Sequence, residues 1–118
     1  MFNSDAERTA ETARLNDLAR TDPGRIKAAW HATRGVADLI AEADGRAEEL
    51  RRALASFSNF EPGNDPYGER DFGSFSLWGE RLLWKIGYYH PERDEHSPVT
   101  WSAELTRRVL TVMLASEY

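Results

Sequence analysis

The fold of this chain is decided by one stretch, residues 71–89, which reads DFGSFSLWGERLLWKIGYY. Apolar and aromatic residues flank the dipeptide Gly79-Glu80, and this pattern is typical of a β-hairpin with a two-residue turn. If Trp78 pairs with Arg81, one face of the hairpin carries three largely apolar pairs, which we expect to face the core: Leu77 with Leu82, Phe75 with Trp84, and Gly73 with Ile86. An isolated hairpin is only marginally stable, so helices or a further strand must pack against it.

Length and composition set the limits of the fold. A chain of 118 residues is expected to form a single α+β domain over residues 1–118 with one core. It contains no cysteine, which excludes disulfides, thiolate metal sites and a thiol nucleophile. No apolar run approaches the roughly 20 residues of a membrane span, and the polar first residues do not resemble a signal peptide. These features favour a cytoplasmic protein without a membrane partner.

The net charge of −5 is unevenly distributed along the sequence. Residues 59–96 hold eight acidic and four basic residues, so they account for most of the excess negative charge. Nucleic-acid-binding proteins usually carry a basic stripe, and direct binding of nucleic acid is therefore not expected. Two interpretations of the acidic segment stay open: a surface that only keeps the protein soluble, or a patch that meets a basic partner.

The segments before the hairpin predict two helical regions and a strand. Ser4 and Glu7 have capping-box spacing and predict a helix to about Arg20, with a thin apolar stripe that includes Leu15 and Leu18. Residues 25–33 alternate with a period of two, which predicts a strand with Trp30 facing the core. Residues 36–57 predict a helical segment interrupted at residues 44–45, where Asp44 is a candidate N-cap.

The last segment, from Thr100 or Ser102 to about Ser116, is apolar on most sides and predicts a buried helix. The loops on either side of the hairpin, residues 58–70 and 90–99, are rich in turn formers and acids. The predicted fold is therefore α+β, with a three-stranded antiparallel sheet, made of one strand and the hairpin, packed by about three helices.

Catalytic chemistry has little support in these residues. The candidate metal ligands lie in the two loops that flank the hairpin: Asp65, Glu69, Asp71, His90 and His96. Their spacing matches neither a calcium loop nor a zinc signature, so we expect no metal and no cofactor. The sequence also contains no nucleophile elbow and no phosphate-binding glycine loop.

Three motifs resemble a known family: NDPYGERDFGSF from residue 64, GERLLWKIGYY from residue 79 and TRRVLTVMLASEY from residue 106. Together with TRGV at residues 33–36, they are similar to small bacterial proteins classified as a domain of unknown function and commonly encoded on plasmids and other mobile elements. The similarity covers roughly residues 10–118. It departs from the family pattern at Gly87, where an acidic residue is usual, and in residues 90–99. The resemblance implies no reaction, cofactor or catalytic residue.

The resemblance does imply a setting, because small acidic proteins of mobile elements often inhibit host defence by binding. The leading hypothesis is therefore a non-enzymatic inhibitor that blocks a nucleic-acid-handling complex, such as a CRISPR effector or a restriction enzyme. The predicted partner-binding residues are six acids and three aromatic anchors: Asp65, Glu69, Asp71, Glu92, Asp94, Glu95, Tyr67, Trp78 and Tyr89. The alternatives are a metal-dependent enzyme and a homo-oligomer that serves plasmid maintenance.

Overall fold

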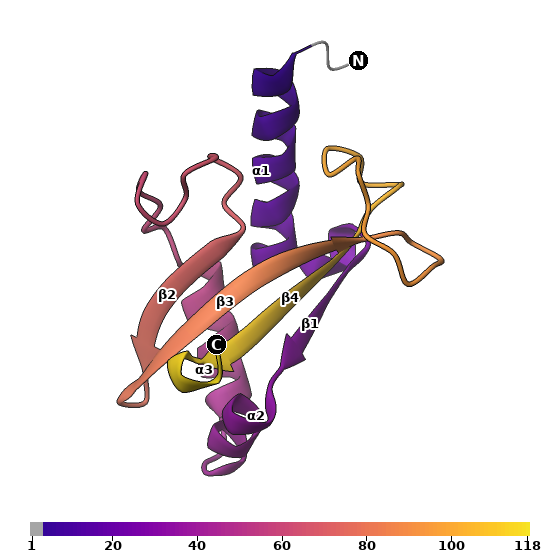
Figure 1. The fold of residues 1–118 in the computed structure, drawn as a ribbon. Helices are drawn as coiled ribbons and strands as arrows, with labels where there is room; N and C mark the ends of the chain where they lie inside the picture. The colour runs from indigo at the N-terminus through magenta and orange to yellow at the C-terminus, as the bar shows by residue number, and fades with distance from the viewer. Residues whose placement is uncertain (1–3) are drawn as a thin grey trace.

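The hairpin belongs to a four-stranded sheet in the computed structural model of the protein, which describes residues 4–118 (Figure 1). The strand order is β1-β4-β3-β2. The strands are β1 (Ala28–Ala32), β2 (Phe72–Leu77), β3 (Glu80–Tyr89) and β4 (Arg107–Leu114). β3 pairs antiparallel with β2 and β4, whereas β1 pairs parallel with β4. The α+β class is confirmed, but the predicted three-stranded antiparallel sheet is wrong, because the sheet is mixed and has a fourth strand.

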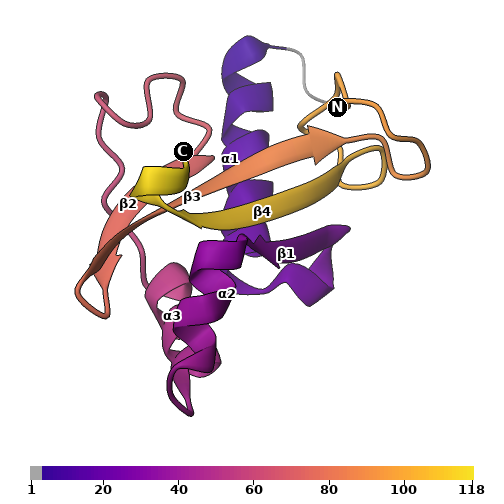
Figure 2. The ribbon, with the colours of Figure 1, turned by 60° about the horizontal axis from the view of Figure 1, so that its bottom comes forward.

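Three α-helices cover one face of the sheet: α1 (Asp5–Thr21), α2 (Arg34–Ala41) and α3 (Arg46–Ala55). Figure 1 shows α1 and α3 passing behind the strands, and the rotated view in Figure 2 shows α2 and α3 packed together on the same side. The core between these layers consists of Ala19, Val36, Leu50, Leu54, Leu82, Trp84, Ile86, Leu110 and Val112. The opposite face of the sheet carries no α-helix in the described chain. Two short 3₁₀ helices, η1 (Pro23–Arg25) and η2 (Ala115–Glu117), complete the fold.

The hairpin is present as predicted, but its turn consists of Trp78 and Gly79 rather than Gly79 and Glu80. Both turn residues have positive φ angles, 56° and 76°, as the mirror-image turns of tight hairpins require. The observed pairs are Leu77 with Glu80, Phe75 with Leu82 and Gly73 with Trp84, so the register is shifted by two residues from the predicted one. Because side chains alternate with a period of two, this even shift leaves the same residues facing the core.

The predicted helix at the end of the chain is wrong, because residues 107–114 form the central strand β4. Along β4, Arg108, Leu110 and Val112 are buried against the helices, and Val109 and Met113 point to the other face. A central strand with apolar residues on both faces lacks the simple alternation that distinguishes a strand from a helix. The pairing with β1 and β3 decides its conformation.

The first half of the chain follows the prediction more closely. Ser4 caps α1, since its hydroxyl oxygen accepts the backbone amide of Glu7 at 3.1 Å. The alternating segment forms β1, and Trp30 packs against the core. The helical segment is broken as predicted, but the N-cap of α3 is Gly45, with φ of 84°, and not Asp44.

Candidate functional site

The predicted apolar stripe of α1 accounts for only part of the face that this helix buries, since Leu15 is buried and Leu18 is partly exposed. Its buried residues are Thr12, Leu15, Asn16, Ala19 and Arg20, and three of them are polar or charged. Buried polar groups cost free energy unless they are hydrogen-bonded, so each needs a partner across the interface with the sheet. The spacing of positions 12, 16 and 20 is helical, and this was the signal in the sequence that could have identified them.

Arg108 lies at the centre of this polar interface, on β4, and its side chain is fully buried. Its Nε donates to Oδ1 of Asn16 at 2.7 Å, and its Nη2 donates to the backbone carbonyl of Thr100. The guanidinium carbon lies 5.3 Å from the ring centroid of Tyr88. Within residues 4–118, Nη1 has no hydrogen-bond partner and no carboxylate forms an ion pair with Arg108. Burial accordingly lowers the pKa of Arg108.

Tyr88, on β3, extends the network to the loop before β2. Its hydroxyl donates to Oε1 of Glu69 at 3.0 Å and accepts from Nδ2 of Asn16 at 2.8 Å. The same amide nitrogen donates to the backbone carbonyl of Glu69 at 2.9 Å. Burial is the main cause that raises the pKa of Tyr88, so the phenol stays protonated and acts as a fixed donor. We refer to Asn16, Glu69, Tyr88, Thr100 and Arg108 as the polar network.

The polar network positions segments that are distant in the sequence. Asn16 belongs to α1, Tyr88 and Arg108 to neighbouring strands, and Thr100 to the loop that precedes β4. Thr12 adds a further link, since its hydroxyl lies 3.0 Å from that of Thr100. These hydrogen bonds therefore hold α1, the sheet and the two long loops in fixed positions relative to one another. A shallow cavity of about 170 Å³ lies beside it, between α1 and the Thr100 loop.

Three of the predicted acids lie together: Glu69 belongs to the polar network, and Asp65 and Asp71 are its neighbours. Asp71 is half-buried, and its pKa is raised first by desolvation and then by the neighbouring carboxylates of Glu69 and Asp65. Oδ1 of Asp65 accepts the backbone amide of Arg70 at 3.0 Å, which closes a turn of the loop. We call residues 58–71, which connect α3 to β2, the acidic loop.

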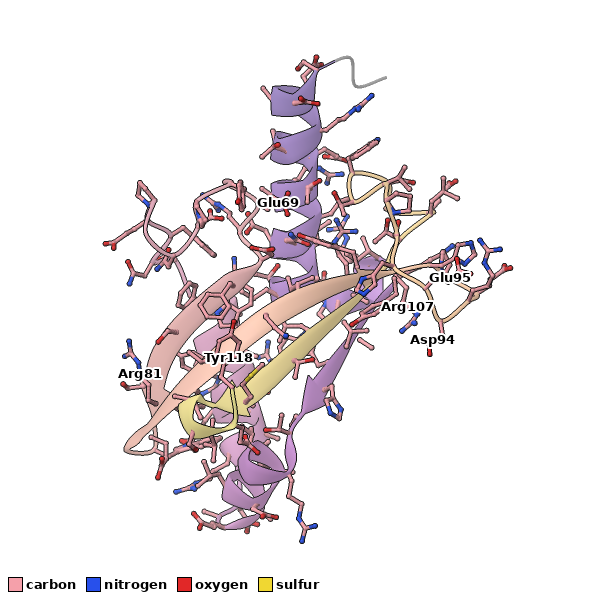
Figure 3. The ribbon with its side chains drawn as sticks, viewed as in Figure 1. Glu69, Arg81, Asp94, Glu95, Arg107 and Tyr118 are labelled. Atoms are coloured by element: carbon pink, nitrogen blue, oxygen red, sulfur yellow. The ribbon has the colours of Figure 1, made fainter. Side chains whose placement is uncertain are left out.

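The other three predicted acids lie elsewhere. Glu92, Asp94 and Glu95 are exposed on residues 90–96, the distal loop, which follows β3. Figures 1 and 2 both show α1 between the acidic loop and the distal loop, and Figure 3 places Asp94 and Glu95 far from Glu69. The structure therefore divides the predicted acidic surface into two groups.

The three predicted aromatic anchors also have different environments. Tyr67, in the acidic loop, is 81% exposed. Trp78 is partly buried against the core, with the guanidinium of Arg46 4.8 Å from its ring centroid. Tyr89 is also partly buried, stacked on His96 at 5.2 Å and approached by Arg107 at 5.3 Å. Tyr67 is therefore the one of the three that presents most of its surface to solvent.

The candidate metal ligands are not assembled into a ligand set. Across residues 4–118, no three histidine, aspartate or glutamate side chains form a group suited to a metal ion. His90 uses Nδ1 to accept the backbone amides of Glu92 and Arg93, at 3.0 and 3.2 Å, and His96 stacks on Tyr89. The two histidines thus have structural roles within and beside the distal loop.

The fold and the site together define a small α+β protein with helices on one face of a mixed sheet and a buried polar network beside an acidic loop. A family model for a protein of unknown function, DUF3768, matches residues 32–117, and the chain belongs to this family. No curated protein and no solved structure match the chain. No helix in the described chain is long and apolar enough to cross a membrane.

Proposed function

We propose that the protein is a non-enzymatic binding protein that uses the acidic loop to dock on the basic surface of a nucleic-acid-handling complex. The observation that carries this proposal is the 81% exposure of Tyr67 between two acidic positions of the loop, Asp65 and Glu69. Tyrosine is enriched among the residues that dominate binding energy at interfaces. Neighbouring carboxylates would steer the loop toward a cationic surface.

The acidic loop is held in shape before any partner arrives. The side chain of Asn64 donates to the backbone carbonyl of Asn59 at 3.1 Å and accepts the amide of Glu61 at 2.8 Å. Phe60 anchors the loop to the core, where its ring packs edge-on against Trp84 at 6.2 Å between centroids. A preformed loop loses less conformational entropy on association, which supports a role in binding.

The contact surface that we propose is smaller than the set of residues predicted from the sequence. The side chain of Glu69 accepts the hydroxyl of Tyr88, and Asp71 is half-buried, so both contribute to the fold. On the loop, Tyr67 is exposed and Asp65 is partly exposed, and neither belongs to the polar network. Glu61 is a further exposed acid of the loop. In the setting that the family resemblance implies, the partner would be a host-defence complex such as a CRISPR effector or a restriction enzyme.

The test is a pull-down with the tagged protein from cells that express several CRISPR and restriction complexes, washed at low and at high salt. We expect the double variant Asp65→Lys/Tyr67→Ala to lose the captured complex. The matched control is Asp44→Lys, an exposed acid in the turn between α2 and α3, which should leave capture unchanged. Circular dichroism would verify that the variants are folded.

A triple variant of the distal loop, Glu92→Lys/Asp94→Lys/Glu95→Lys, separates the two groups of acids. Capture that survives this variant and fails with the acidic-loop variant supports the proposal. Loss of capture only with the distal-loop variant would overturn the choice of the acidic loop. Failure of the wild-type protein to capture any of the complexes would overturn the proposed partner class.

A further inference from the structure

The face of the sheet without α-helices, which we call the open face, differs in charge from the rest of the protein. Its strand positions alternate with those that face the core, and no aspartate or glutamate occupies any of them. Three cations stand on it: Arg81 and Lys85 on β3, and Arg107 on β4. The strand positions of the open face therefore carry net positive charge, and beside them Glu92 of the distal loop lines a hollow with Arg107.

None of these three cations forms an ion pair with a carboxylate in the described part of the chain. Arg81 and Lys85 are exposed, and Arg107 is partly exposed beside Tyr89. Lys85 is four residues from Arg81, and Arg107 pairs with Tyr89, four residues further along β3. At about 3.4 Å per residue, the cations are spaced roughly 13 Å apart in a row of about 27 Å.

Aromatic rings lie beside this row. Tyr118 is 76% exposed, with its ring centroid 6.0 Å from Nζ of Lys85 and 6.1 Å from the ring of Phe72. Figure 3 shows Arg81, Tyr118 and Arg107 in this order along the sheet. Glu117 fixes the position of this segment, because its carboxylate accepts the hydroxyl of Thr33 at 2.6 Å and the backbone amide of Leu114 at 2.8 Å. The ring of Tyr118 is thus held over the sheet with most of its surface exposed.

We propose that the open face binds single-stranded nucleic acid, with Arg81, Lys85 and Arg107 contacting phosphates and Tyr118 stacking on a base. A row of cations without ion pairs, with one exposed ring beside it, suits a single strand, because its bases are unstacked and its phosphates follow one path. A duplex offers no free base to an exposed ring. The inference departs from the expectation drawn from net charge, because that total hides how the charges are placed.

The proposal concerns a different surface from the acidic loop and does not depend on the proposed function. Three phosphate contacts predict that the logarithm of the association constant falls with the logarithm of salt concentration with a slope of about −2. Loss of stacking on one base predicts a drop in affinity of roughly 5- to 150-fold.

The experiment is fluorescence anisotropy with a labelled oligothymidylate and a labelled oligouridylate, titrated with the full protein at several salt concentrations. A labelled duplex of the same length is the comparison. We expect Lys85→Ala to weaken binding of the single strands and to reduce the salt slope by about 0.7. Arg34→Ala is the matched control, since the Arg34 side chain is 93% exposed and lies on α2. It should change neither quantity.

Tyr118→Ala tests the stacking ring, with Leu105→Ala, an exposed apolar side chain in the loop before β4, as its control. Loss of affinity with Tyr118→Ala alone supports the open face, whatever the outcome of the pull-down. Equal effects of the Lys85 and Arg34 variants, or equal binding of duplex and single strand, would overturn the proposal. It would also be overturned if polyglutamate or phosphatidylserine vesicles displaced the oligonucleotide as well as unlabelled single strand does, because the face would then recognise negative charge alone.

Discussion

Gly73 is the position in β2 where the smallest substitution should have a large effect on stability. It is buried opposite Trp84, and a methyl group at its Cα would overlap the indole ring and approach Cζ of Phe57 to 2.5 Å. Trp84 is fully buried, with the rings of Phe57 and Phe60 packed edge-on against it at 5.4 and 6.2 Å. Phe57 and Phe60 are only partly buried, so the fully buried indole has the least freedom to move. The clash must therefore displace the strand or the aromatic cluster.

The expected cost follows from these contacts. Overpacking a well-filled core destabilises by about 1–3 kcal/mol, and the rigidity of this cluster places Gly73→Ala near the upper end. The lower flexibility of alanine in the unfolded chain offsets about 0.4–1 kcal/mol. We therefore expect a net loss of about 2 kcal/mol in the free energy of unfolding. In urea denaturation followed by circular dichroism, this is a midpoint shift of roughly 1 M.

Two other glycines provide controls of graded severity. Gly24→Ala should be neutral, because a Cβ there meets nothing within 4 Å. Gly87→Ala should cost less than Gly73→Ala, because its Cβ would meet the ring of Tyr89, at 2.8 Å from Cε2, and that side chain is near the surface. A Gly73→Ala variant as stable as Gly24→Ala would refute the packing of β2 against Trp84.

The double variant Gly73→Ala/Trp84→Phe identifies the cause of the cost. A smaller ring leaves space for the methyl group, so the two substitutions should be less destabilising together than the sum of each alone, by about 0.5–3 kcal/mol. Strict additivity would show that the alanine acts elsewhere. Because Phe60 anchors the acidic loop on this cluster, Gly73→Ala should also weaken capture in the pull-down.

Three further predictions concern the core and the polar groups. Leu54→Ala, at a fully buried position of α3, should lower the free energy of unfolding by about 2–5 kcal/mol in urea denaturation. Hydrogen bonds from Thr33 and the Leu114 amide lower the pKa of Glu117, so its contribution to stability should be present at neutral pH and disappear as pH falls through the lowered pKa. The difference in the free energy of unfolding between wild type and Glu117→Gln should shrink on acidification. A difference that grows would contradict this prediction. Because the pKa of Tyr88 is raised, its phenol should not ionise below about pH 11. The increase in tyrosinate absorbance up to that pH should therefore be the same for wild type and Tyr88→Phe. A smaller increase in the variant would show that Tyr88 ionises in this range and contradict the prediction.

The hairpin shows how much of the fold could be predicted from local pattern. The alternation of side chains along a strand correctly predicted which residues of β3 face the core. That prediction held although the turn was misplaced, because the register error was two residues and an even shift keeps each side chain on its face. The turn itself was misplaced because Trp78 occupies a positive-φ position, which a bulky residue rarely adopts. Partial burial of Trp78 against the core, a tertiary contact, accompanies that backbone conformation.

The central strand β4 could not be distinguished from a helix by its sequence. Its apolar residues occupy both faces, and the information that decides its conformation lies in the edges of β1 and β3, which are distant in the sequence. The parallel pairing with β1 was missed for the same reason, because a predicted helix offers no strand to pair with. One wrong segment therefore accounts for the wrong strand number and for the missing parallel pair.

The candidate site was predictable in part. Three of the predicted acids, in the acidic loop, do lie together, but the distal loop with the other three lies on the other side of α1. The polar network was missed because polar residues such as Asn16 and Arg108 are usually exposed, and because the segment that contains Arg108 was predicted to be a helix. Their burial becomes understandable only when α1 is placed across β3 and β4, where each supplies the other's hydrogen bond.

The placement of charge connects the two proposed surfaces. The acidic loop and the open face belong to different sides of the sheet: the loop adjoins Tyr88, which points toward α1, whereas Lys85 and Arg107 point away from the helices. The two proposals together describe a protein whose acidic loop would meet the cationic surface of a nucleic-acid-handling complex while the three cations of the open face hold the strand that such a complex exposes. If both surfaces act together, Lys85→Ala should reduce capture of the complex from an untreated lysate more than from a nuclease-treated one. Only the untreated lysate contains the nucleic-acid strand that Lys85 would bind. Equal reduction in both samples would mean that Lys85 contacts protein rather than nucleic acid.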